Sequence, residues 1–215
     1  GPKGIKEVIN IQLKHSKSYV KYKIIFHELN STESELIFED EKVKVYTIPL
    51  NHRVYTNGFL FKEKEKSRKI NISAVKKFKE IDICDYNNLK AGKDFKLDSG
   101  DVIENSELTY NPEKPLSYAY CSDTSYKPTI IEMIEGADLL YHESTFLTDK
   151  EDLASKTGHS TAKQAATIAK KANVKKLVLG HYSSRYKDIS LFKKEAQEVF
   201  KNVSIAETGR VFSSK

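Results

Sequence analysis

Three short apolar runs in this chain each end in residues that can bind a metal ion or carry a proton. The runs span residues 116–121, 138–141 and 176–179, and each has the composition of a buried strand. Asp123 follows the first run, His142 and Glu143 follow the second, and His181 follows the third. Because α/β proteins place ligands and metals at the carboxyl ends of their strands, we expect these side chains to share one edge of a sheet.

The rest of the chain divides into a sheet-rich first half and an α/β last third. In the first half, alternating patterns predict strands over residues 18–29, 35–38, 43–48 and 55–61 and a hairpin over 95–103. A helix is predicted over residues 73–82, with Ser73 as its N-cap. The last third predicts helices over residues 129–136 and 191–200, and strands over 203–206 and 210–213. An alanine-striped helix is expected to begin at Ser160 or Thr161, either of which can cap it.

Length and composition indicate a globular protein. A chain of 215 residues is long enough for one sizeable core, so we treat residues 1–215 as one domain. The formal net charge of +6 suits a phosphate-bearing partner, although a lysine-rich surface also serves plain solubility. Charge alone therefore leaves nucleic-acid binding open.

The two cysteines and the hydropathy pattern predict a cytoplasmic protein. Cys84 and Cys121 are too few for a disulfide framework, and we expect both to be buried, reduced thiols. The sequence has no run of 18 apolar residues and no secretory signal, so no membrane association is expected.

A dense charge run follows the predicted strand over 55–61. Residues 62–69 alternate lysine and glutamate and end in Ser-Arg-Lys. Such a run is typical of a solvated turn, and the alternative is a protruding basic arm at about residues 62–93.

Three of the six histidines, His52, His142 and His181, stand at the ends of predicted strands, and His159 is a fourth candidate. His52 and His181 each follow a predicted strand, and together with Asp123 they form a donor set that suits Zn, Mn or Fe, unless each is only a hydrogen-bonded structural residue. His159 lies in Gly-His-Ser-Thr at the start of the alanine-striped helix, where a helix N-terminus attracts phosphate. His159 is therefore either a proton donor beside a phosphate or an incidental residue of the cap.

Four motifs occur together in the order and spacing of a known family. They are Ser-Asp-Thr around Asp123, His142-Glu143-Ser144-Thr145, His159-Ser160-Thr161 and Gly180-His181-Tyr182-Ser183-Ser184-Arg185-Tyr186. In this respect, and in Asn51-His52 upstream, the chain resembles ribonuclease Z, the tRNA 3′-end processing endonuclease family of the metallo-β-lactamase superfamily. The resemblance implies an α/β metallo-β-lactamase fold, an αββα four-layer sandwich that is incomplete here in its N-terminal half.

The resemblance also implies a role for each matching residue. Asp123 would bridge two zinc ions, with His52 on one metal and His181 on the other, and manganese is an alternative metal. His159, supported by Glu143, would protonate the leaving ribose oxygen. Arg185 would hold a phosphate. The implied substrate is precursor tRNA, from which the enzyme removes 3′ trailers, and the family suggests a homodimer.

The chain lacks the His-x-His-x-Asp-His motif of the superfamily, which supplies most of the metal ligands. The chain is therefore expected to be the C-terminal portion of a longer enzyme or a degenerate homologue, and to be inactive alone. The Gly-Pro element of the family's tRNA-gripping arm is also absent from residues 62–93. Two alternatives stay open. One is a hydrolase of another phosphodiester or ester, and the other is a non-catalytic RNA-binding or dimerisation homologue.

Overall fold

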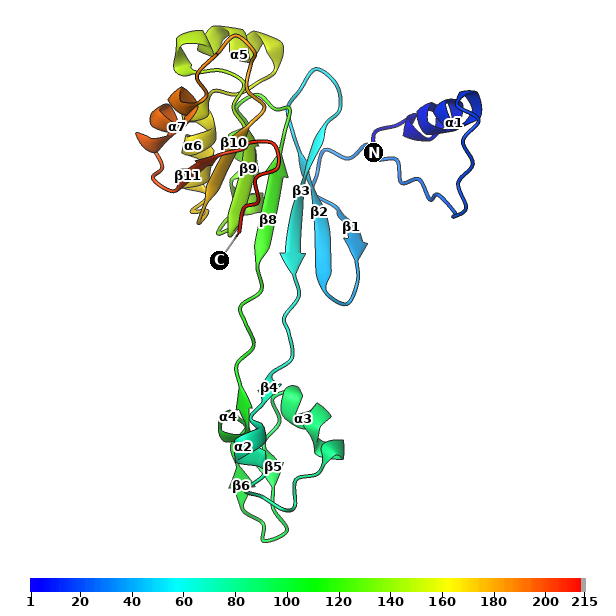
Figure 1. Ribbon diagram of the computed structural model, residues 1–215, viewed down its shortest axis with the longest axis vertical. Coiled ribbons are helices and arrows are strands. Elements are labelled where there is room, and N and C mark those ends of the chain that lie inside the picture. The colour runs from blue at the N-terminus through cyan, green and yellow to red at the C-terminus, as the bar shows by residue number, and fades with distance from the viewer. Residues whose placement is uncertain (214–215) are drawn as a thin grey trace. The chain divides into compact units, whose positions relative to one another are not determined.

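The computed structural model describes residues 1–213, which form two compact units (Figure 1). Unit 1 comprises Gly1–Glu39, Lys44–Lys62 and the chain from Leu116 onward. Unit 2 comprises Asp40–Val43 and Glu63–Pro115. Each unit has its own buried apolar cluster, so each is described by itself.

Unit 1 is built on a seven-stranded sheet with the order β1-β2-β3-β8-β9-β10-β11. Its strands are β1 (Leu36–Glu39), β2 (Val43–Pro49), β3 (Asn57–Glu63), β8 (Ser117–Cys121), β9 (Leu139–Glu143), β10 (Leu177–Gly180) and β11 (Val203–Ile205). β8 pairs with β3 in the antiparallel sense, whereas β8, β9, β10 and β11 are parallel. The predicted α/β class is thereby confirmed, and the parallel half matches the α/β last third of the sequence.

Helices cover one face of the parallel strands. The helices of this region are α5 (Glu151–Thr157), α6 (Ala162–Lys171) and α7 (Ser190–Gln197). The alanine stripe of α6 is fully buried, which lets the helix backbone approach β9 and β10 closely (Figure 1). Thr161 caps α6, because its side chain accepts from the backbone N–H of Gln164 and the Gln164 side chain accepts from the backbone N–H of Thr161.

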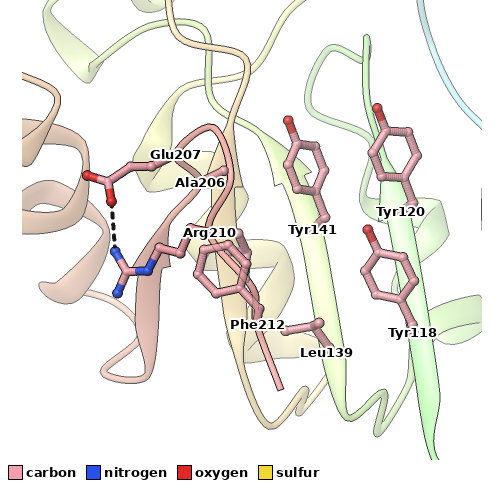
Figure 2. A pocket seen from close by; sticks show the side chains of 9 residues that line it. Tyr118, Tyr120, Leu139, Tyr141, Ala206, Glu207, Arg210 and Phe212 are labelled. Carbon is pink, nitrogen blue, oxygen red and sulfur yellow. Dashed lines mark hydrogen bonds and ion pairs between the residues drawn. The ribbon is translucent and has the colours of Figure 1, made fainter. Parts of the chain in front are cut away.

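Tyrosines occupy the other face of the same strands (Figure 2). The rings of Tyr120 and Tyr141 stack with centroids 4.8 Å apart. With Tyr118 and Phe212 they line a cavity of about 540 Å³. Burial raises the pKa of Tyr118 and of Tyr141 to about 12, so both hydroxyls stay neutral at physiological pH.

Unit 2 is a small folded element with a core of its own. It contains β4 (Lys69–Ile70), α2 (Ile72–Val75), α3 (Tyr86–Lys90), β5 (Phe95–Lys96), β6 (Val102–Ile103), α4 (Asn105–Leu108) and β7 (Thr109–Tyr110). The core consists of Val75, Ile81, Leu89, Ile103 and Leu108. The segment 62–93, for which the sequence left a turn or a basic arm open, lies mostly in this unit.

Several local predictions were wrong. Residues 18–29 form no strand and have only an isolated bridge, Pro2 to Leu29, while α1 (Ile5–His15) precedes them as a helix. Residues 210–213 form no strand either. The helix predicted over 73–82 is the single turn α2, capped by Asn71 rather than by Ser73. The region 129–136 forms the short 3₁₀ turns Pro128–Ile130 and Glu132–Ile134.

The cysteine prediction was half right. Cys121 is buried, and burial raises the pKa of its thiol to about 12. Cys84 is exposed. Within residues 1–213, no helix combines the length and the apolar character needed to cross a bilayer.

Candidate active site

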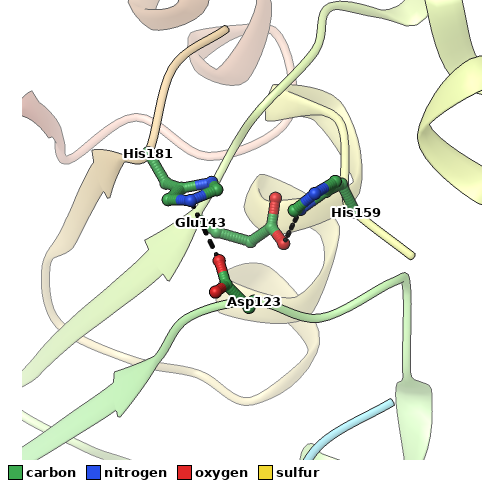
Figure 3. Close-up of side chains that lie close together, drawn as sticks. All are labelled: Asp123, Glu143, His159 and His181. Atoms are coloured by element: carbon green, nitrogen blue, oxygen red, sulfur yellow. Dashed lines mark hydrogen bonds and ion pairs between the residues drawn. The ribbon is translucent and has the colours of Figure 1, made fainter. Parts of the chain in front are cut away.

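The carboxyl ends of β8, β9 and β10 meet at one edge of the sheet. Cys121 of β8 lies opposite His142 of β9, and Glu143 of β9 lies opposite Gly180 of β10. This register brings Asp123, Glu143 and His181 together, so the shared edge predicted from the sequence is confirmed (Figure 3).

Four side chains gather at this edge. One ligand atom each from Asp123, Glu143, His159 and His181 lies within 4.8 Å of the others. His181 Nε2 is 3.0 Å from Asp123 Oδ1, and His159 Nδ1 is 2.9 Å from Glu143 Oε1 (Figure 3). The site therefore contains two His–carboxylate pairs side by side.

The Glu143 carboxylate is the structural centre of the site. Its side chain is fully buried and accepts five hydrogen bonds. The donors are Thr124 N, Thr145 N, Thr145 Oγ1, Ser160 N and His159 Nδ1. A buried carboxylate is tolerated only when hydrogen bonds replace its hydration, and here the loops after β8 and β9 and the start of α6 all contribute.

His159 is placed by the turn that ends α5. Gly158 closes this helix with a φ of 78°, and the His159 backbone N–H donates to Ala154 O. A Cβ at Gly158 would lie 2.8 Å from His52 Nδ1, so glycine is required for space as well as for conformation. His159 Nδ1 can then donate to Glu143 and leave Nε2 for other chemistry.

His52 lies beside His159 and outside the group of four. Their ring centroids are 5.2 Å apart. His52 Nδ1 is 2.9 Å from Gly158 O, which accepts a hydrogen bond from Nδ1–H, so Nε2 keeps its lone pair. The backbone carbonyl thus sets the tautomer that a metal-binding histidine needs.

Asp123 and His181 both have a left-handed backbone. Their φ angles are 56° and 60°, and only two other non-glycine residues of the described chain, Lys17 and Asn173, have positive φ. Such conformations cost free energy and cluster at functional sites, where the surrounding structure holds them. The two strained residues are the members of one His–carboxylate pair, with His181 Nε2 3.0 Å from Asp123 Oδ1.

The buried oxygen of Asp123 points to a cation site. Asp123 Oδ1 is buried and has no hydrogen-bond partner among the described residues, although His181 Nε2 lies 3.0 Å away. Two such donors so close together, from a carboxylate and an imidazole, form a set suited to Zn or Mn. Asp123 and His181 therefore fit a metal ion at this edge.

His142 and Arg185 lie outside this cluster. His142 is fully buried under the helices, and burial lowers the pKa of its imidazole, so the ring is neutral. Arg185 is exposed, and its guanidinium donates to Ser183 Oγ at 3.2 Å. No acidic side chain of residues 1–213 pairs with Arg185, so its charge is available to a ligand.

Sequence reasoning missed the residues that support the site. Thr145 and Gly158 were quoted only as parts of motifs and Ser160 only as a possible helix cap, yet they hold Glu143 and His159 in place. The sequence feature that could have identified them is position: Gly158 and Ser160 adjoin His159, and Thr145 lies two residues after Glu143.

Residues 109–182 match the family described as Beta-lactamase superfamily domain. The chain is 42% identical over 206 residues to Ribonuclease Z of Bacteroides fragilis (strain YCH46), covering 96% of this chain and 67% of that protein. It is 44% identical over 213 residues to Ribonuclease Z of Cytophaga hutchinsonii, covering 99% of this chain and 67% of that protein. The chain thus spans about two thirds of the length of these relatives.

Solved structures show the same fold. Human tRNase Z, short form, superposes with a TM-score of 0.63 at 24% identity, covering 100% of this chain and 66% of that one. The metallo-beta-lactamase fold protein YhfI from Bacillus subtilis gives a TM-score of 0.58 at 19% identity, covering 95% of this chain and 62% of that one. The metallo-β-lactamase fold expected from the sequence is confirmed, and residues 1–213 supply one large sheet of the expected four-layer sandwich. Its sequence relatives show that the chain belongs to the ribonuclease Z family.

Proposed function

We propose that the protein is a metal-dependent endoribonuclease that cleaves precursor tRNA and removes its 3′ trailer. The observation that carries this proposal is the pairing of a buried Glu143–His159 couple with the Asp123–His181 couple at one strand edge. The first couple suits proton transfer and the second suits cation binding. Phosphodiester hydrolysis needs both functions.

His159 is the proton donor in this proposal. Its Nδ1–H is directed to Glu143 Oε1 at 2.9 Å, so the proton that is transferred leaves from Nε2. The buried carboxylate stabilises the imidazolium before transfer and holds the ring in one orientation. The acceptor is the ribose oxygen that leaves when the phosphodiester breaks. The His159 side chain is 17% exposed, so RNA can approach it.

Asp123 and His181, together with His52, would hold the metal. Their oxygen and imidazole donors suit two zinc ions, with manganese as the alternative. When bound, divalent cations supply Lewis acidity that activates water and stabilises negative charge on phosphoryl oxygens. The residues of this chain orient those donors and leave further coordination positions to other ligands. Arg185 is proposed to hold a non-bridging oxygen of the same phosphate.

Unit 2 is proposed to bind the body of the tRNA. Residues 62–93 contain ten lysine or arginine residues against five acidic ones. Lys76, Lys77 and Lys79 are exposed at the end of α2. Exposed lysines bind a phosphate backbone by releasing its counterions, without reading its sequence. Arg68 has a structural role, because it donates to Thr109 Oγ1 at 2.6 Å.

Family membership supports two further proposals, a homodimer and a cytoplasmic location. Sedimentation of the purified protein tests the first, and fractionation of cells that express it tests the second. A monomer at micromolar concentration would contradict the dimer.

The test of the proposed function is His159→Ala in the protein assayed with precursor tRNA. We expect cleavage to fall below detection while the metal content stays within about twofold of wild type, because His159 moves a proton and is not assigned as a ligand. His27→Ala is the matched control, since no described contact involves the His27 side chain, and it should cleave normally. Full activity of His159→Ala would refute the proton-donor role. Because the chain lacks the His-x-His-x-Asp-His motif, the assay uses a longer form that carries it, and absence of cleavage by that wild-type form supplied with zinc or manganese would refute the function itself.

A further inference from the structure

The Thr145 hydroxyl lies between the two couples of the site. Thr145 Oγ1 is 2.7 Å from Glu143 Oε2 and 2.8 Å from His181 Nδ1. The residue is 7% exposed, so these two partners account for the polar environment of the hydroxyl. A hydroxyl has one proton to donate. The partner that receives it therefore determines whether His181 Nδ1 carries a hydrogen.

The direction of that proton follows from Glu143. Backbone N–H groups of Thr124, Thr145 and Ser160 approach both carboxylate oxygens, and an N–H group can only donate. The ionised carboxylate accepts from all of its neighbours, so the Thr145 hydroxyl donates to it as well. The Thr145 oxygen must then accept, and His181 Nδ1 must carry the hydrogen.

This assignment leaves the lone pair of His181 on Nε2. That atom faces Asp123 Oδ1 at 3.0 Å, and Oδ1 has no hydrogen-bond partner among the described residues. Two acceptor atoms that face each other repel unless a cation lies near both. The tautomer and the buried oxygen therefore favour the same occupant, a divalent cation.

We propose that Thr145 is a positioning residue that fixes the Nδ1–H tautomer of His181 and so keeps Nε2 available to a divalent cation. Through Glu143, the same hydroxyl is linked to His159, whose Nδ1–H the carboxylate also accepts. One buried carboxylate thus sets the tautomers of both histidines, directly for His159 and through Thr145 for His181. Only the use of the cation in RNA cleavage rests on the proposed function.

The test compares Thr145→Val with Thr145→Ser. Valine matches the shape of threonine without the hydroxyl, whereas serine keeps the hydroxyl. Histidine ¹⁵N NMR of the metal-free protein at pH 8 reports the tautomer, with the His181 resonances assigned from their loss in His181→Asn. Zinc affinity is measured by competition with a chelating dye.

Wild type and Thr145→Ser should show the Nδ1–H tautomer of His181 and zinc affinities within about threefold of each other. Thr145→Val should show a mixture of tautomers and a zinc affinity about 10–100-fold weaker, as for other residues that orient a metal ligand. Circular dichroism verifies the fold of each variant. If Thr145→Val does not fold, the spectra of the wild type and of Thr145→Ser still show whether His181 has the Nδ1–H tautomer.

An Nε2–H tautomer in wild type, or unchanged zinc affinity in a folded Thr145→Val, would overturn the proposal. Neither measurement involves RNA. If a longer form that carries the His-x-His-x-Asp-His motif shows the expected tautomer and zinc affinity but cleaves no precursor tRNA, the proposed function is refuted and the role of Thr145 stays intact.

Discussion

Replacing Glu143 with glutamine tests the hydrogen-bond network at its centre. Glutamine has nearly the same shape, but it offers one acceptor oxygen and one NH₂ group. If the amide oxygen takes the place of Oε2, it keeps the donors Thr145 and Ser160. The NH₂ group then faces the Thr124 N–H, which lies 2.7 Å from Oε1 in the wild type.

The expected cost follows from these contacts. An unsatisfied buried N–H costs about 1–3 kcal/mol, and the remaining bonds change from charge-assisted to neutral, losing a further ~2 kcal/mol together. We therefore expect Glu143→Gln to lower the free energy of unfolding by about 3–5 kcal/mol. Urea denaturation followed by far-ultraviolet circular dichroism measures it, with a chelator present so that metal binding does not contribute.

Glu135→Gln is the matched control. Glu135 is an exposed glutamate of the same unit, and its replacement should change the free energy of unfolding by less than about 0.5 kcal/mol. If Glu143→Gln lowers the free energy of unfolding by less than about 1 kcal/mol, the five donors around residue 143 do not need a charged acceptor, and this description of the network is refuted.

Three further predictions concern other parts of the chain. Gly158→Ala should lower the free energy of unfolding by about 1–2 kcal/mol, because φ at this position is 78° and the new Cβ would contact His52. An unchanged melting temperature would count against this turn geometry. Burial alone would raise the pKa of Asp138, but hydrogen bonds from Lys175 and Ser117 outweigh burial and lower that pKa from its usual range. The stability that Asp138 adds over Asp138→Asn should therefore be full above the ordinary aspartate pKa of about 4 and be lost as the pH falls through the lowered pKa of the folded protein. A difference in stability that does not change with pH would contradict this. Replacing the exposed lysines 76, 77 and 79 with alanine should raise KM for precursor tRNA and flatten its salt dependence while sparing a small model diester; equal effects on both substrates would exclude unit 2 from RNA binding.

The parallel strands and their polar ends were predictable because their signals are local. Each apolar run is short, contributes buried residues to the core and is followed at once by a polar residue, so periodicity and position sufficed for Asp123, Glu143 and His181. His159 was found from its place before a capped helix, and the capping box of Thr161 and Gln164 bears out that reading.

Other features depend on contacts between residues far apart in the sequence. The strand predicted over 18–29 fails because alternation there meets no partner strand among the described residues. His142 and Glu143 are neighbours in one motif, yet one is enclosed by the core and the other by five donors, which only the fold decides. Thr145 gains its role from His181, 36 residues away.

The most direct test of the account is the zinc content of the purified protein and of Asp123→Ala, measured by elemental analysis after dialysis against buffered zinc. Asp123 supplies a buried oxygen that has no hydrogen-bond partner among residues 1–213, so its loss should remove most of the bound zinc. His15→Ala, an exposed histidine on α1, should keep the wild-type content. Zinc bound by wild type and lost from Asp123→Ala is the predicted result, and equal zinc in the two proteins would contradict the proposed metal site.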